Sequence, residues 1–255
     1  VDLLVLPPEQ FGSLLQHFTG SKHHNVALRE YALKKHLSLS ERGIKLQKEE
    51  DKLIEFKTEE KFYNYLGMDW IPPELRENTG EIEAAIRSAE DKPDGLPDLI
   101  ELKDMKGDLH IHSDYPLDSS HDYGNASMED MLKVAISKKY EYFGFSEHNP
   151  SISNHTSSEV YEILKKRKDK IEQLKDTYKK SIRIINLLEV DILASGNLAL
   201  DEKSLDLIDA AIVSIHSSFN TPSDKMTERI LKGLAHPKAK ILAHPTGRLL
   251  NSRAG

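Results

Sequence analysis

From residue 106 onward the sequence alternates between strand-like and helix-like segments, and this alternation constrains the fold more than any other feature. Strand patterns cover residues 107–112, 141–147, 182–190, 209–216 and 239–244. Helix patterns cover 127–139, 157–180 and 222–235, with a shorter one near 203–206. Strands that alternate with helices predict an α/β fold with a parallel sheet, either open or closed into a barrel. Because such barrels carry their chemistry at the carboxyl ends of the strands, functional side chains are expected there.

Each of these strands ends in a side chain that can bind a metal ion. The residues are His110 and His112, Glu147 and His148, Glu189 and Asp191, His216, and His244, with Asp118 in the loop after the first strand. A single histidine is more often a surface or core residue than a ligand, which is the expectation for His23, His24, His36 and His236. The loop histidines His121 and His155 fit either role. A run of consecutive strands that all end in this way favours a metal site.

The first strand carries the sequence Asp-Leu-His-Ile-His over residues 108–112. Strand side chains alternate between faces, so His110 and His112 should point the same way, with Leu109 and Ile111 packed against the helices. Imidazole and carboxylate ligands suit zinc, manganese and iron. The chain has no cysteine, which excludes thiolate ligands and disulfides. The size of the set predicts two or three ions that share bridging carboxylates, bind phosphate and lower the pKa of bound water.

The first 105 residues follow a different pattern. A buried strand is expected over residues 1–6, helices over 9–17, 25–35 and 81–89, and strand and turn signals over 38–45. The charge-rich stretch 48–61 is expected to be a solvated helix and loop. Proline and glycine at 92–97 indicate turns, and a domain boundary is expected near 100–106. The prediction is a small α+β subdomain over 1–75, a linker over 76–105 and a second domain over 106–255.

The overall charge and hydropathy limit the class of protein. The net charge of −7 argues against sequence-independent coating of nucleic acid, although it allows a local basic groove or metal-mediated phosphate binding. No apolar run is long enough to span a membrane and no signal peptide is visible, so a cytoplasmic protein without a membrane partner is expected. The chain begins inside a strand pattern without Met and stops just after a motif, which favours a piece of a longer polypeptide.

The strand-end motifs resemble those of the PHP (polymerase and histidinol phosphatase) family of metal-dependent phosphoesterases. The resemblance lies in residues 108–112, Ser146-Glu147-His148, Glu189-Val190-Asp191, His216-Ser217 and His244-Pro245-Thr246-Gly247-Arg248. It implies a distorted barrel of seven strand–helix units, incomplete here because the family's last Asp-x-His motif is absent. The ligands that it implies are His110, His112, Asp118, His148, Glu189, His216 and His244. Of these, His110, His112, Glu189 and His216 are also expected to be catalytic.

A second resemblance is to bacterial-type family X DNA polymerases. It rests on residues 216–220, 226–229 and 244–250, on His17-Phe18-Thr19-Gly20-Ser21, and on Trp70 to Arg76. In this comparison Asp2 resembles the third catalytic carboxylate of the polymerase site, which would hold Mg²⁺ with partners outside this sequence. The substrate-binding residues that the resemblance implies are Gly20, Ser21, Asn25, Arg29 and Arg248.

Together the resemblances imply the end of the palm, a thumb-like subdomain and a PHP domain. The PHP domain would be a Mn²⁺- or Zn²⁺-dependent 3′–5′ exonuclease linked to gap-filling DNA repair, in a monomer that binds DNA and dNTP. Two alternatives stay open. One is a small-molecule phosphatase of the histidinol-phosphate type, which the polymerase-like amino-terminal residues disfavour. The other is a non-catalytic metal-binding module that stabilises the polymerase, which Glu147 in place of the family's usual Asp keeps open.

Overall fold

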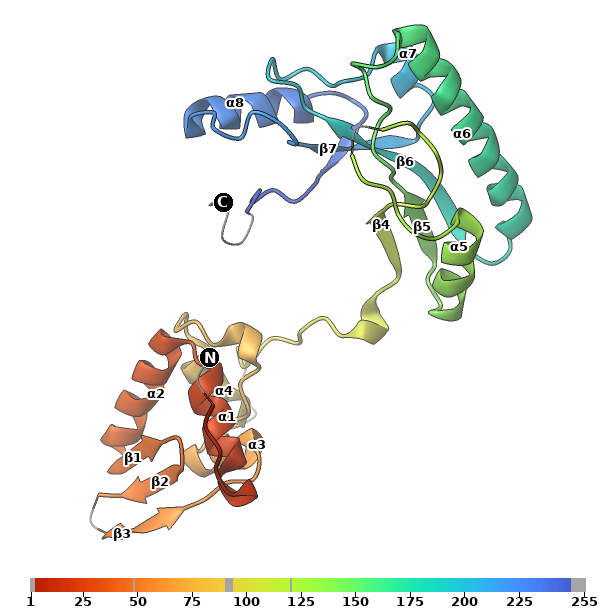
Figure 1. The fold of residues 1–255 in the computed structure, drawn as a ribbon. Helices are drawn as coiled ribbons and strands as arrows, with labels where there is room; N and C mark the ends of the chain where they lie inside the picture. The colour runs from red at the N-terminus through yellow and green to blue at the C-terminus, as the bar shows by residue number, and fades with distance from the viewer. Residues whose placement is uncertain (1–2, 48, 90–93, 120, 249–255) are drawn as a thin grey trace. The chain divides into compact units, whose positions relative to one another are not determined.

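The chain divides into two compact units, Val1–Leu99 and Ile100–Gly255, in a computed structural model that describes residues 3–47, 49–89, 94–119 and 121–248 (Figure 1). Each unit has its own hydrophobic core, and each is described here by itself. Among the described residues, no helix has the length and apolar character needed to cross a membrane.

The first unit combines short helices with a three-stranded antiparallel sheet in the order β1-β2-β3. Its elements are η1 (Pro8–Gln10), α1 (Phe11–Thr19), α2 (Lys22–Lys34), β1 (Leu37–Ser40), β2 (Gly43–Leu46), β3 (Glu49–Ile54), α3 (Glu59–Leu66), η2 (Pro73–Leu75) and α4 (Glu81–Ala89). The core contains Leu28 from α2, Ile44 from β2 and Phe62 from α3, all 1% exposed or less. The predicted α+β character of this region is therefore confirmed.

Three expectations for this unit need correction. The amino-terminal strand is not formed over residues 3–6, where Leu3 is 87% and Val5 is 78% exposed. The charge-rich stretch 48–61 contains β3 and the start of α3, because pairing with β2 overrides the poor strand propensity of its sequence. The first part of the expected linker 76–105 belongs to the core, since Ile82 and Ala85 of α4 are buried there.

The second unit is a five-stranded, all-parallel, curled sheet in the order β4-β5-β6-β7-β8 with helices between its strands (Figure 1). Its elements are η3 (Leu102–Asp104), β4 (Gly107–Ile111), α5 (Met128–Ser137), β5 (Tyr142–Phe145), α6 (Ser157–Tyr178), β6 (Arg183–Asp191), α7 (Glu202–Leu205), β7 (Ala210–Ser214), α8 (Ser223–Leu234) and β8 (Ala239–Leu242). The predicted strand–helix alternation is confirmed, with element ends within about two residues of the expectation.

The longest helix, α6, shows how local sequence specifies these elements. Thr156 caps its amino terminus by accepting a hydrogen bond from the Glu159 amide, and the Glu159 carboxylate accepts one from the Thr156 amide. This reciprocal capping box satisfies amides that would otherwise lack partners. Val160, Leu164 and Ile171 then recur at helical spacing on the buried face. The cap and the spacing together explain why the helix begins and packs where it does.

The sheet has one face toward the helices and one face away from them, and β6 shows the division. Leu188 and Val190 pack with Leu164 of α6, whereas Leu187 packs on the opposite face with Ile212 of β7. Because side chains alternate, Glu189 shares the face of Leu187, away from the helices. The metal-capable side chains gather at the carboxyl end of this face.

Candidate metal centre

Glu189 of β6 is the centre of a cluster of five histidines from the ends of the four other strands. Its Oε2 lies 2.9 Å from His110 Nε2, 3.1 Å from His112 Nε2 and 3.3 Å from His148 Nδ1. Its Oε1 lies 2.9 Å from His244 Nε2 and 3.2 Å from His216 Nε2. The Glu189 side chain is 1% exposed, so the carboxylate is surrounded by imidazoles. Six of the seven predicted metal ligands, Glu189 and these five histidines, therefore lie together.

Strand register explains how β6 and β7 bring their side chains together. Glu189 pairs with Ile212, and Asp191 pairs with Ser214, in a parallel ladder. His216 follows Ser214 by two residues and so emerges on the same face. His216 Nδ1 contacts Asp191 Oδ1 at 2.6 Å, which orients its Nε2 toward Glu189. An imidazole held by a carboxylate in this way is typical of metal-ligating histidines.

In β4 the sequence expectation was partly wrong. Asp108 pairs with Phe143 and Ile111 pairs with Phe145, so that two residues of β4 face one residue of β5. This irregularity turns Leu109 away from the helices, against the cluster of Leu187 and Ile212, whereas Ile111 packs on the helix side as predicted. A bulge of this kind re-aims side chains next to a functional site. Despite it, both His110 and His112 reach Glu189.

The end of β8 also departs from regular geometry. His244 has φ +26°, a value that a residue with a side chain rarely adopts. Simple alternation would place His244 with Leu242, which packs on the helix side. The unusual backbone conformation accompanies an imidazole that contacts Glu189 and lies 3.3 Å from His216. Such conformations concentrate at functional sites.

The loop after β4 adds side chains that the sequence did not single out. His121 Nε2 lies 3.2 Å from Asp191 Oδ2, and its ring lies 4.5 Å from that of His216, between centroids. The exposed Asp122 places Oδ1 3.2 Å from His148 Nε2. Both residues belong to an irregular loop whose path no periodic pattern specifies, although His121 was one of the two loop histidines left open.

The loop is held against β4 by close backbone contact. The Gly124 amide donates to the Ser113 carbonyl at 3.0 Å, and the Asp114 amide donates to the Ala126 carbonyl at 2.9 Å. A Cβ atom at Gly124 would lie 1.8 Å from the carbonyl oxygen of His112, so no other residue fits without a shift. This approach brings His121 and Asp122 to the cluster.

Asp118 does not join the cluster. Its side chain is 75% exposed, and its Oδ2 lies 2.9 Å from Nε2 of His155, the other loop histidine. Among the described residues, Asp118 is in none of the groups whose atoms lie close enough to share an ion. The length of the loop, which the sequence shows, is the reason that its contribution was hard to place.

Three groups of side chains have the geometry of ion sites. In each, the ligand atoms lie within 4.8 Å of one another. The groups are His110, His112 and Glu189; Glu189, His216 and His244; and His121, His148 and His216. Two of them share Glu189 and two share His216, so the groups are adjacent. The ligands are all nitrogen and oxygen, which suits zinc, manganese or iron.

Unpaired nitrogen atoms support the fit to metal. The Nδ1 atoms of His112 and His148 are buried and make no hydrogen bond with any described residue. His148 Nδ1 lies 3.3 Å from Glu189 Oε2, but the geometry is not that of a hydrogen bond. A buried polar atom without a partner is costly, whereas a metal ion would use its lone pair.

The protonation states follow from the same contacts. Burial favours the neutral acid of Glu189, but hydrogen bonds from His110, His112 and His216 outweigh it and lower its pKa. Burial, reinforced by neighbouring histidines, lowers the pKa of His148 to about 4. For His216 burial acts in the same direction, but the carboxylates of Asp191 and Glu189 outweigh it and raise the pKa to about 9. Metal binding at His216 would therefore release a proton.

Glu147 stands where the PHP family usually has Asp, and its contacts are those of a structural residue. Its Oε2 accepts hydrogen bonds from Nε of Arg167 at 2.8 Å and from Nη2 at 2.5 Å, and its Oε1 accepts from Ser113 Oγ at 2.5 Å. The side chains of Glu147 and Arg167 are 3% exposed or less. The pair joins α6 to the residues that follow β4 and β5, and these hydrogen bonds occupy both carboxylate oxygens of Glu147.

The predicted substrate residues of the first unit lie at the turn between α1 and α2. Gly20 ends α1 with φ +71°, a conformation that favours glycine, and Ser21 caps α2 by accepting from the His24 amide. Asn25 donates to the His17 carbonyl at 2.8 Å, and the exposed Arg29 lies 3.4 Å from His17 Nδ1. Asn25 therefore has a structural role at this turn.

The two remaining predicted site residues lie apart from these groups. Arg248 is exposed and follows Gly247, which lines a cavity beside His244. Asp2 lies outside the described residues.

Comparison with known proteins assigns the site to a family. The model of the PHP domain matches residues 108–251, more than half of the chain and all of the cluster. The chain belongs to the PHP domain family. The matched range includes Glu189 and all five histidines that contact it.

Further matches cover the first unit. The model of the DNA polymerase beta thumb matches residues 14–77. A relative described as DNA polymerase/3'-5' exonuclease PolX, from Bacillus subtilis (strain 168), is 36% identical over 257 residues. That alignment covers 100% of this chain and 42% of the relative, so the chain spans less than half of the relative's length. The resemblance to family X polymerases is confirmed over both units.

Proposed function

We propose that the chain is the thumb and PHP part of a family X DNA polymerase, and that its PHP unit is a metal-dependent phosphodiesterase that removes nucleotides from DNA 3′ ends. The observation that carries the proposal is the cluster of five histidines around the buried Glu189. A phosphodiester is anionic, so a site that concentrates divalent cations is suited to it. The relative's printed description as a 3'-5' exonuclease supports the same substrate class.

The ligand set differs from the sequence expectation in one loop. We assign one ion to His110, His112 and Glu189, and a second to Glu189, His216 and His244. A third would lie at His121, His148 and His216, with Asp122 beside His148 and in place of Asp118. Mn²⁺ and Zn²⁺ both accept this mixture of imidazole and carboxylate.

The roles of the side chains follow from their contacts. Divalent ions, when bound, would neutralise phosphate charge and lower the pKa of a water molecule. Glu189 presents one carboxylate oxygen to His110 and the other to His244, so it can bridge two ions. Asp191 fixes the ring of His216 through Nδ1, which leaves Nε2 for the ion. Arg248, an exposed cation four residues after His244 in the sequence, would contact a phosphate.

The polymerase function of the first unit rests on the thumb match and on the relative. On this proposal Gly20, Ser21, Asn25 and Arg29 lie near the incoming dNTP, and Asp2 helps to hold Mg²⁺ with carboxylates supplied from outside this sequence. Gapped DNA would be the substrate for synthesis in repair. A cytoplasmic, monomeric protein is part of the same proposal.

The test is a trimming assay with a 3′-labelled primer and Mn²⁺. We expect the protein to shorten the primer and a His110→Ala, His112→Ala double variant to lose this activity, because one ion would keep only Glu189. The matched control replaces His23 and His36, which lie outside the cluster, with alanine. Trimming by the double variant at the unaltered rate would refute the proposal.

The two alternatives give different results in the same preparation. A small-molecule phosphatase would hydrolyse histidinol phosphate faster than the oligonucleotide, and the thumb match argues against it. A non-catalytic module would hydrolyse neither substrate. Elemental analysis of the purified protein separates the cases further, since less than one ion per chain would favour the module. We expect two or three.

A further inference from the structure

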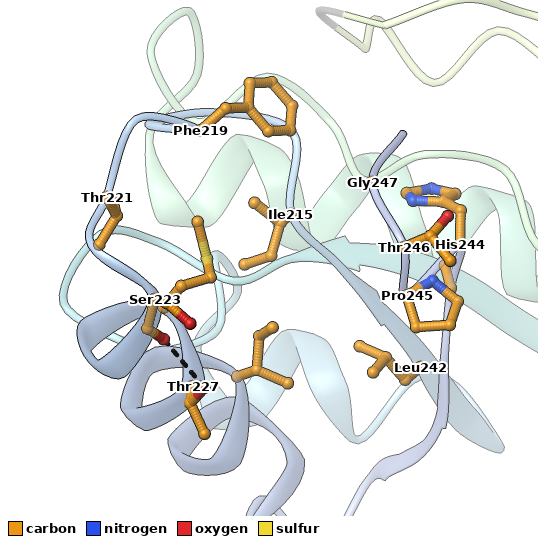
Figure 2. A pocket seen from close by; sticks show the side chains of 13 residues that line it. Ile215, Phe219, Thr221, Ser223, Thr227, Leu242, His244, Pro245, Thr246 and Gly247 are labelled. Atoms are coloured by element: carbon orange, nitrogen blue, oxygen red, sulfur yellow. Dashed lines mark hydrogen bonds between the residues drawn. The ribbon is translucent and has the colours of Figure 1, made fainter. Parts of the chain in front are cut away.

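A cavity of about 320 Å³ opens beside the metal cluster, and the cluster itself does not fill it (Figure 2). Its walls come from the end of β7 and the loop that follows, from α8, and from the loop after β8. In Figure 2, Thr221, Ser223 and Thr227 lie on one side, and Leu242, His244 and Pro245 lie on the other. His244 belongs to both sites, since its Nε2 lies 2.9 Å from Glu189 Oε1.

The walls are mostly apolar, with a few hydroxyl groups. Ile215, Met226 and Ile230 are half-buried and line the cavity, as does the exposed Phe219 on the loop between β7 and α8. Among the described residues that line the cavity, only His244 carries an ionisable side chain. A cavity with this lining does not favour a phosphate, which needs cations or several hydrogen-bond donors. It suits an uncharged, flat group of moderate size.

The hydroxyl groups of the cavity wall favour particular ligands among uncharged, flat groups. Thr221 Oγ1 donates to the Ser218 carbonyl at 2.6 Å, and Thr227 Oγ1 donates to the Ser223 carbonyl at 2.9 Å. Because both hydroxyl protons are donated within the protein, the two hydroxyl oxygens can accept hydrogen bonds from a ligand. A ligand with amino or imino N–H groups at its edge could donate to them. The lining therefore fits an aromatic heterocycle better than a hydrocarbon.

We propose that this cavity binds the nucleobase of the 3′-terminal nucleotide while the phosphodiester lies at the metal cluster. The inference rests on the proposed exonuclease function and names its substrate subsite. The apolar cavity and the metal cluster adjoin at His244. A nucleotide matches this arrangement, because it joins a flat, uncharged heterocycle to an anionic phosphate. Stacking on an aromatic ring tolerates every base, so the cavity would hold the last nucleotide without reading its identity.

The test uses two 5′-labelled single-stranded oligonucleotides that differ only in the last residue, thymidine or an abasic tetrahydrofuran nucleotide. The scissile phosphodiester is the same in both. With Mn²⁺, we expect the protein to remove thymidine with a kcat/KM about 5- to 150-fold higher, the range that one stacked base provides. Phe219→Ala and Met226→Ala should each reduce this ratio by lowering the thymidine rate, with the abasic rate unchanged.

Leu231→Ala is the matched control, because Leu231 lies on the same helix, is 62% exposed and does not line the cavity. It should keep the wild-type ratio. Equal removal of thymidine and the abasic residue by the wild type would overturn the cavity assignment while the exonuclease function stands. A ratio unchanged in both Phe219→Ala and Met226→Ala would also overturn it. Removal of neither residue would refute the exonuclease and the cavity together.

Discussion

Each unit contains a buried carboxylate in contact with histidine, and the two arrangements differ in their remaining partners. In the first unit, His24 Nδ1 lies 2.6 Å from Glu81 Oε1, and His24 Nε2 lies 2.9 Å from the Tyr63 hydroxyl. Glu81 also accepts from the amides of Asn78 and Thr79. Every polar atom of this histidine side chain has a partner within the protein, as a structural network requires.

In the second unit, five imidazoles surround one carboxylate, and the buried Nδ1 atoms of two of them have no hydrogen-bond partner among the described residues. More donors and acceptors converge there than the protein can satisfy. The comparison shows that a histidine–carboxylate contact by itself says little about function. The informative observation is the excess of ligand atoms around Glu189, which a bound cation would use.

The largest expected effect comes from removing the shared carboxylate charge. Glu189→Gln keeps the shape of the side chain but weakens two ion groups at once. We expect trimming activity to fall by at least about 10³-fold, since the ions supply several kcal/mol of transition-state stabilisation. Elemental analysis should show a loss of bound metal, with the circular dichroism spectrum unchanged.

Glu81→Gln is the control that sharpens the comparison. It removes the corresponding charge from the structural network, so bound metal and trimming should stay at the wild-type level. If Glu81→Gln depleted the metal as strongly as Glu189→Gln, the distinction between the two carboxylates would fail.

An intermediate effect is expected from the buried ion pair of the first unit. Arg76 donates to both carboxylate oxygens of Glu59, at 2.7 and 3.0 Å, and its side chain is fully buried. Arg76→Met would leave Glu59 charged and buried, which costs about 3–5 kcal/mol of unfolding free energy. Urea unfolding, followed by fluorescence of Trp70, the only tryptophan, measures this, because Trp70 Nε1 contacts Glu59 at 3.0 Å.

Arg42→Met is the surface counterpart of Arg76→Met. Arg42 is 61% exposed and lies 3.9 Å from Glu41, so its loss should change the unfolding free energy by about 0–1 kcal/mol. Bound metal should be the same in both variants. Equal destabilisation by Arg42→Met and Arg76→Met would contradict the structural role of the buried pair.

The smallest effect is a pH dependence of the first unit. Burial lowers the pKa of His24 below its ordinary value, although Glu81 acts in the opposite direction. A histidine whose pKa is depressed on folding stabilises the protein above its unfolded pKa, about 6.5, and this stability is lost as the pH falls. The urea concentration at the midpoint of unfolding, followed by Trp70 fluorescence, should therefore fall as the pH is lowered from 7.5 to 5.5. In His24→Gln this midpoint should fall by less over the same pH interval. A fall equal to that of the wild type would exclude His24 as the cause.

Much of the second unit could be predicted because its signals are local. Strand and helix periodicity, together with caps such as Thr156, give the elements of the parallel sheet. In a parallel sheet all carboxyl ends lie at one edge, so residues at strand ends such as His112, His148 and His216 were expected to meet. The charge-rich β3 could not be predicted in this way, because its strand conformation depends on pairing with β2.

The sequence by itself determined the order of strands and helices, the chemical type of the metal-capable side chains and their gathering at the carboxyl ends of the strands. These follow from short-range periodicity and from the geometry of parallel strands. Only the tertiary structure decided that Leu109 turns away from the helices, that His121 and Asp122 approach the site and that Asp118 does not. A bulge and an irregular loop take their conformation from contacts with distant residues, as at Gly124 against His112, and no local pattern encodes such contacts.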